Sequence, residues 1–147
     1  MARISEPLDV PIPVEAAFDH VADFTTTADW DPGITRARRL DDGPIGLGSR
    51  FKVQLKLGVV TVPLVYEITA YERPHRVVLA TQGLLYRGED DVRFEATESG
   101  TKVHWNATFA LRGPGALLDP ALGVGFRRTA AKAVAGLERS LRALATN

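Results

Sequence analysis

The C-terminal stretch, residues 116–145, is the longest segment with helical periodicity, and it constrains the possible folds most. Asp119 followed by Pro120 is typical of a helix start, because Asp caps free amide groups and Pro already has a helical φ. A helix over residues 120–145 would be about 39 Å long. Its apolar residues recur every three or four positions and therefore share one face: Leu122, Phe126, Ala130, Ala133, Leu137, Leu141 and Leu144.

The small residues in the middle of this face leave two interpretations open. Ala130 and Ala133 lie between the larger side chains of Phe126 and Leu137. Small residues allow close packing of a helix backbone against a sheet. They also leave space for a ligand between helix and sheet, with Phe126 and Ala130 at the cavity.

The rest of the chain predicts a sheet that such a helix would cover. Residues 14–24 predict a short helix, followed by a broken helical turn over 25–31. Later strands follow one another through short turns, which indicates antiparallel pairing. A sheet with one apolar face needs a cover, and the final helix is the only long amphipathic element. The predicted strands are 3–11, 34–40, 51–57, 60–71, 76–81, 86–97 and 102–111. We therefore expect one α+β domain over residues 1–147, a curved antiparallel sheet wrapped around a long C-terminal α-helix.

Composition excludes several classes of function. The chain has 18 basic residues, 18 acidic residues and no cysteine, so disulfides, thiolate metal sites and cysteine nucleophiles are excluded. No basic run indicates binding to nucleic acid or to an anionic membrane surface. No apolar run is long enough for a signal peptide or a membrane span. We expect a cytoplasmic protein.

Motifs for metals and nucleotides are absent from the sequence. His20, His75 and His104 lack the spacing of metal ligands. The glycine-rich stretch 43–48 lacks the Lys-Ser/Thr ending of a phosphate-binding loop and leads into a strand. We expect no metal and no cofactor.

The alternation of the strands predicts which side chains face the interior. For these side chains core packing and the lining of a ligand pocket are both open. Trp30 in particular is expected either as a lid that joins the short helices to the sheet or as a pocket wall near the entrance. The residues predicted to line the pocket are Trp30, Phe51, Val53, Leu55, Leu64, Tyr66, Tyr86, Asp90, Trp105, Phe109, Leu122, Phe126 and Ala130.

One acidic cluster, Glu89-Asp90-Asp91, lies within a predicted strand. Alternation with Val92 places Asp90 on the inner face and Asp91 on the outer face. A buried carboxylate has a raised pKa, which suits a general acid or base. A solvated strand end is the alternative. Asp90 and Tyr66, which offers a phenolic hydroxyl, are the candidate catalytic residues.

Five short segments together resemble one protein family over the whole chain. They are residues 11–18, the Trp30-Asp31-Pro32 element, residues 46–51 before a strand, residues 71–76 between strands, and residues 100–103 in the last hairpin. Their order and spacing are similar to those of the START-like or helix-grip (SRPBCC) superfamily, in its polyketide cyclase/dehydrase-type branch. The resemblance implies a helix-grip fold with a deep apolar pocket between the sheet and the C-terminal helix.

The function that the resemblance implies is binding of a hydrophobic small molecule, lipid or polyketide-like, in that pocket. An enzyme of the cyclase or dehydratase type, with Asp90 and Tyr66 as acid/base groups, is the alternative. A regulatory or stress protein with a nearly filled pocket is a third. No catalytic set is carried over from the family, because its polar pocket residues vary. The expected partner is the ligand alone, with no nucleic acid and no membrane span, in a monomer or homodimer.

Overall fold

The computed structural model describes the backbone of residues 2–57, 59–112 and 119–145, and the side chains of residues 7–56, 59–112 and 131–145. The elements follow the predicted order. They are β1 (Ala2–Val10), α1 (Val14–Ala22), the 3-10 helix η1 (Phe24–Thr26), α2 (Thr27–Trp30), β2 (Ile34–Arg39), β3 (Arg50–Leu57), β4 (Val60–Glu72), β5 (Arg76–Gln82), β6 (Tyr86–Thr97), β7 (Gly100–Leu111) and α3 (Asp119–Leu144).

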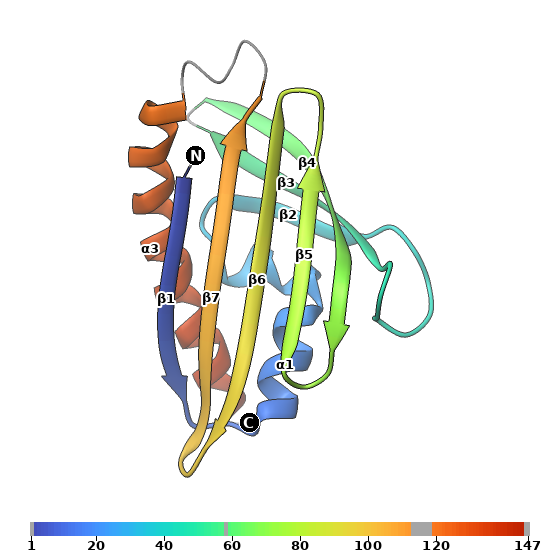
Figure 1. Ribbon diagram of the computed structural model, residues 1–147, viewed down its shortest axis with the longest axis vertical. Helices are drawn as coiled ribbons and strands as arrows, with labels where there is room; N and C mark the ends of the chain where they lie inside the picture. The colour runs from blue at the N-terminus through green and yellow to red at the C-terminus, as the bar shows by residue number, and fades with distance from the viewer. Residues whose placement is uncertain (1, 58, 113–118, 146–147) are drawn as a thin grey trace.

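The strands form a seven-stranded sheet in the order β1-β7-β6-β5-β4-β3-β2. Every neighbouring pair is antiparallel. Figure 1 shows the sheet in front with α1 and α3 behind it, so both helices lie on one face. The predicted fold, a curved antiparallel sheet with a long C-terminal helix on its inner face, is confirmed.

Strand alternation sets the inner face as predicted. In β4, Leu64, Tyr66 and Ile68 are buried, whereas Glu67 between them is exposed. The pairing aligns inward residues across four strands: Tyr66 lies opposite Thr81, Thr81 opposite Gly88, and Gly88 opposite Phe109. The register thus fixes which inward-facing residues are neighbours across the sheet.

The first helix is shorter than the sequence predicts. It ends at Ala22, because Asp23 adopts an extended conformation and caps the following 3-10 turn. One carboxylate oxygen of Asp23 accepts hydrogen bonds from the amide and the hydroxyl of Thr25, at 3.2 and 2.5 Å. On its buried side α1 places the ring of Phe18 edge-on to Phe94, with ring centroids 5.3 Å apart.

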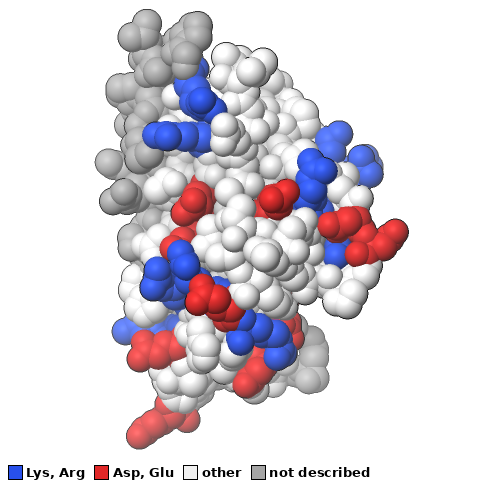
Figure 2. Space-filling model, turned by 45° about the vertical axis from the view of Figure 1, so that its right-hand side comes forward, with Lys and Arg blue, Asp and Glu red and all other residues white. Residues whose placement is uncertain are grey.

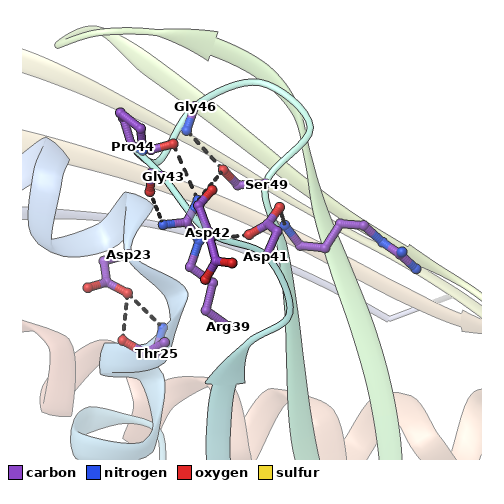
Figure 3. Close-up of polar contacts among 10 residues, drawn as sticks. Asp23, Thr25, Arg39, Asp41, Asp42, Gly43, Pro44, Gly46 and Ser49 are labelled. Atoms are coloured by element: carbon purple, nitrogen blue, oxygen red, sulfur yellow. Dashed lines mark hydrogen bonds and ion pairs between the residues drawn. The ribbon is translucent and has the colours of Figure 1, made fainter.

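The glycine-rich loop between β2 and β3 is organised around the guanidinium group of Arg39 (Figure 3). Arg39 binds the Asp41 carboxylate at 2.7 Å and donates to the carbonyl oxygens of Gly43 and Pro44 and to the Ser49 hydroxyl. The hydrogen-bond donors of Arg39 are therefore used within the loop. They account for the conformation of this glycine-rich stretch without a bound phosphate.

Helix α3 contributes Leu137 and Leu141 to the core, as predicted. Ala133, for which close packing and space for a ligand were both open, is buried with them. Leu144, expected on the same face, is 37% exposed and is the last residue of the helix. Leu122, Phe126 and Ala130 lie outside the residues whose side chains are described, and their expected place at the cavity stays a prediction.

The backbone of α3 approaches the end of α2 closely at Gly136. A Cβ atom at this position would lie 2.0 Å from the carbonyl oxygen of Trp30, far inside van der Waals contact. The backbone of α3 therefore lies directly against the end of α2, and only glycine permits this.

This contact predicts an inverted effect for Gly136→Ala. In an open helix the change gains up to about 1 kcal/mol from helix propensity. Here the added methyl group has to displace the backbone of Trp30, so we expect a loss of about 1–3 kcal/mol in the free energy of unfolding. Urea denaturation measures it. Gly46→Ala is the control, because a Cβ there meets nothing within 4 Å; a stability gain at Gly136 equal to its helix propensity would contradict the contact.

Candidate functional site

An apolar pocket of about 420 Å³ opens at the end of the sheet where the β3–β4 and β5–β6 connections lie (Figure 1, top). Four of the predicted ligand residues line it: Leu55, Leu64, Tyr86 and Phe109. The other five lining residues were not predicted, and they are Val62, Gly83, Leu84, Leu85 and Leu111. Residues 83–85 form a loop, and a loop has no alternation from which an inward face can be predicted.

Two aromatic rings form one side of this pocket. The rings of Tyr86 and Phe109 stack nearly parallel, at 9°, with centroids 6.2 Å apart. Phe109 lies opposite Gly88, where a Cβ atom would be 2.9 Å from the Phe109 ring. The absence of a side chain at Gly88 therefore lets the ring lean across β6.

The mouth of the pocket exposes large apolar side chains. Leu84 is 95% exposed and Leu85 58% exposed, and both line the pocket. Val59 and Val60, at the neighbouring hairpin, are also exposed. Clustered exposed apolar side chains are typical of binding sites, because a bound molecule removes their apolar surface from water.

The remaining described candidates lie deeper in the molecule and do not line this pocket. Phe51 and Val53 are fully buried in the core. Trp30 is buried against Trp105, with ring centroids 5.6 Å apart at 87°. Trp30 thus joins α2 to the sheet, which is the lid arrangement considered from the sequence.

Beneath the pocket, Asp90 is buried on the inner face and is only 8% exposed. Its pKa is raised to about 7, mainly by burial and also by the negative charges of Asp31 and Glu89, whereas a hydrogen bond from the Trp105 side chain opposes the rise. The inward placement from strand alternation is therefore confirmed, and the solvated strand end is not observed.

Asp31 and Tyr66 belong to the same electrostatic cluster. Burial raises the pKa of Asp31 to about 6, although the amide of Gly33 donates to its carboxylate at 2.8 Å. Burial holds the pKa of Tyr66 well above its usual value, and the charges of Asp90 and Asp31 act in the same direction. No chemical signal in the sequence pointed to Asp31, which stood out only within a turn element.

Two larger grooves lie on the surface. One, of about 700 Å³, is on the outer face of the sheet beside Glu67, Arg87 and Glu89. Figure 2 shows basic and acidic side chains next to one another over this side of the molecule. The other, of about 760 Å³, runs between α2 and α3. Of these three, only the apolar pocket of about 420 Å³ at the end of the sheet has almost entirely apolar walls among the described residues.

Among the described residues, no group of His, Asp and Glu side chains could hold a metal ion. His20 is hydrogen-bonded to Ser140 at 2.8 Å, and burial lowers its pKa. His104 lies 3.8 Å from Glu95 on the outer face of β7. Within the described part of the chain, no helix is long and apolar enough to cross a membrane.

Comparison with known proteins places this chain in a family. The sequence matches the family described as "Polyketide cyclase / dehydrase and lipid transport" over residues 1–147. The chain therefore belongs to that family. Among curated proteins, none matches the chain in sequence.

Solved structures show the same fold at low sequence identity. A START superfamily protein from Mycobacterium smegmatis is 14% identical with a TM-score of 0.79, covering 98% of this chain and 99% of its own. A protein from Thermus thermophilus, TTHA0849, is 19% identical with a TM-score of 0.77, covering 99% and 98%. The Zhui aromatase/cyclase from Streptomyces sp. R1128 is 12% identical with a TM-score of 0.76, covering 95% and 92%.

The buried Asp90 predicts that the protein loses stability as the pH rises toward neutrality. The folded pKa, about 7, exceeds the value of 3.8 for a free carboxyl group. Between these values the folded state holds a proton that the unfolded state has released, so the free energy of unfolding falls with rising pH. The loss is complete above about pH 7. At about 1.4 kcal/mol per pKa unit, it amounts to about 4 kcal/mol at most.

Asp90→Asn isolates this contribution, because it keeps the shape of the side chain and removes its titration. Urea denaturation at about pH 5 and about pH 8 should show a larger loss of stability for the unsubstituted protein than for the variant. An identical pH dependence of the two proteins would show that Asp90 does not titrate as a buried carboxyl group.

Proposed function

We propose that the protein binds a hydrophobic small molecule, lipid or polyketide-like, in the apolar pocket at the end of the sheet. The observation that carries the proposal is the apolar pocket of about 420 Å³, which is open to solvent between exposed leucines. Membership in a family described by polyketide cyclisation and lipid transport supports it.

The pocket walls indicate how such a ligand would be held. Transfer of apolar surface from water contributes about 25 cal/mol per Å², without directional requirements. The stacked rings of Tyr86 and Phe109 add a flat surface suited to an aromatic ring system. Leu84 and Leu85 would exchange contact with water for contact with the ligand.

Leu85→Glu tests the location of binding. A charge at the rim should lower the affinity for N-phenyl-1-naphthylamine, a neutral fluorescent apolar probe, by about tenfold or more, because the carboxylate must lose water when the ligand covers it. Stability should change by less than about 0.5 kcal/mol, since Leu85 is a largely exposed loop residue.

Leu47→Glu is the matched control. Leu47 is 73% exposed, but it lies in the β2–β3 loop and does not line the pocket. Probe fluorescence should be unchanged by this control. Equal loss of binding in both variants, or no binding to the unsubstituted protein, would contradict the proposed site.

Acid/base catalysis is a second candidate function, favoured by the placement of Asp90 and Tyr66 below the pocket. A carboxyl group with a pKa of about 7 is poised to give or take a proton near neutrality. Tyr66, whose pKa is well above its usual value, stays protonated and can donate a hydrogen bond to a substrate carbonyl. These are the roles that a cyclisation or dehydration requires.

A linear poly-β-ketone thioester tests this candidate. If Asp90 transfers the proton, Asp90→Asn should abolish formation of cyclised or dehydrated product while probe affinity is retained. Product analysis by mass spectrometry measures it, with Asp91→Asn as the control, because Asp91 lies on the outer face and pairs with Arg76. Equal turnover of the Asp90 variant and the unsubstituted protein would remove Asp90 from the mechanism.

A further inference from the structure

The hydroxyl group of Thr81 is the one buried side-chain polar atom, among the described residues, that has no hydrogen-bond partner. Thr81 lies in β5 and is 3% exposed. An unpaired buried hydroxyl is unfavourable, because it has lost its hydrogen bonds to water and gained none in the protein. Because no protein group pairs with it, this hydroxyl is free to form a hydrogen bond with a bound molecule.

The position of Thr81 relates it to both the pocket and the acidic cluster. Thr81 is two residues before Gly83, which follows the end of β5 and lines the pocket. Across the sheet it lies opposite Tyr66 and opposite Gly88. Asp90 is two residues beyond Gly88, so it is a diagonal neighbour of Thr81 on the same face. Thr81 therefore lies between the apolar pocket and Asp90.

The side chain of Thr81 points to the same side as the inner face of β6. A Cβ atom at Gly88 would be 3.2 Å from the methyl group of Thr81 and 2.9 Å from the ring of Phe109. Phe109 also lines the pocket. Thr81 and the pocket residue Phe109 therefore both border the space that a side chain at Gly88 would occupy.

The carboxyl groups near Tyr66 make this region acidic. Asp31 and Asp90 are the carboxyl groups that act on Tyr66. None of the buried residues whose side chains are described is Lys, Arg or His. An anionic group placed here would lose its hydration beside two carboxyl groups, at a large cost, with no buried cation among the described side chains to compensate.

We propose that the ligand is an amphipathic molecule whose uncharged hydroxyl group binds at Thr81, Tyr66 and Asp90, and that the pocket rejects anionic amphiphiles such as carboxylates. This inference rests on the proposed ligand-binding function. It adds the polarity and the charge of one end of the ligand.

A hydroxyl group suits this cluster because it both donates and accepts. It can accept a hydrogen bond from Thr81 or Tyr66 and donate one to a carboxyl oxygen of Asp90. A carboxylate has no proton to donate and adds a like charge. A hydrocarbon leaves Thr81 unpaired.

Three ligands that share one ring system test the inference: naphthalene, 2-naphthol and 2-naphthoate. At about pH 7 the naphthoate is ionised and the naphthol is not. Titration calorimetry, or displacement of the fluorescent probe, should give binding of naphthol about tenfold or more tighter than that of naphthoate. Naphthalene reports the apolar contribution alone.

Two variants of Thr81 assign the difference to this residue. Thr81→Val keeps the shape and removes the hydroxyl, so naphthol affinity should fall about tenfold while naphthalene affinity is unchanged. The melting temperature should stay the same or rise, because an unpaired polar atom is removed. Thr81→Ser keeps the hydroxyl and should retain the preference for naphthol.

The outcomes separate this inference from the proposed function. Binding of naphthalene without any preference for naphthol over naphthoate would overturn the inference and leave the apolar pocket in place. An equal loss of all three ligands in Thr81→Val would also overturn it, since it would show a structural role. Absence of binding by all three ligands to the unsubstituted protein would overturn both.

Discussion

The rest of the structure depends on covering one apolar face of a single antiparallel sheet. At one end, Phe18 of α1 and Leu137 and Leu141 of α3 fill the space beneath the strands. The contact of the α3 backbone with Trp30 at Gly136 holds α2 and α3 together over that region. At the other end, Leu64 and Phe109 of the sheet are also buried, and they border the apolar pocket.

Polar groups between these two ends give the pocket its chemical character. Asp90 and Tyr66 are buried among apolar residues, and each carries a raised pKa because its charged form is poorly solvated there. Burying such groups lowers stability unless they are paired. The same placement provides a neutral proton donor and acceptor next to a hydrophobic pocket, which both ligand recognition and acid/base chemistry require. Thr81, unpaired within the protein, extends this polar region toward the mouth.

The fold was predictable from the sequence because strand alternation and helical periodicity are local signals. Alternation placed Asp90 and Tyr66 inside, and the helical pattern placed Leu137 and Leu141 in the core. The site was predictable only in part. Asp31 lies in a turn after α2, and its burial and raised pKa arise from packing between segments distant in sequence. The loop leucines of the mouth follow no period. For Phe51 and Val53, alternation indicated the inward direction but could not separate core from pocket.

The location of the ligand is tested most directly by NMR, through a titration of the ¹⁵N- and methyl-labelled protein with N-phenyl-1-naphthylamine. We predict chemical-shift changes centred on Val62, Leu84, Leu85 and Leu111, which line the pocket, with Leu47 unaffected. Saturable changes confined instead to Val65, Thr69 and Ala80 would place the ligand in the outer-face groove and contradict binding in the apolar pocket.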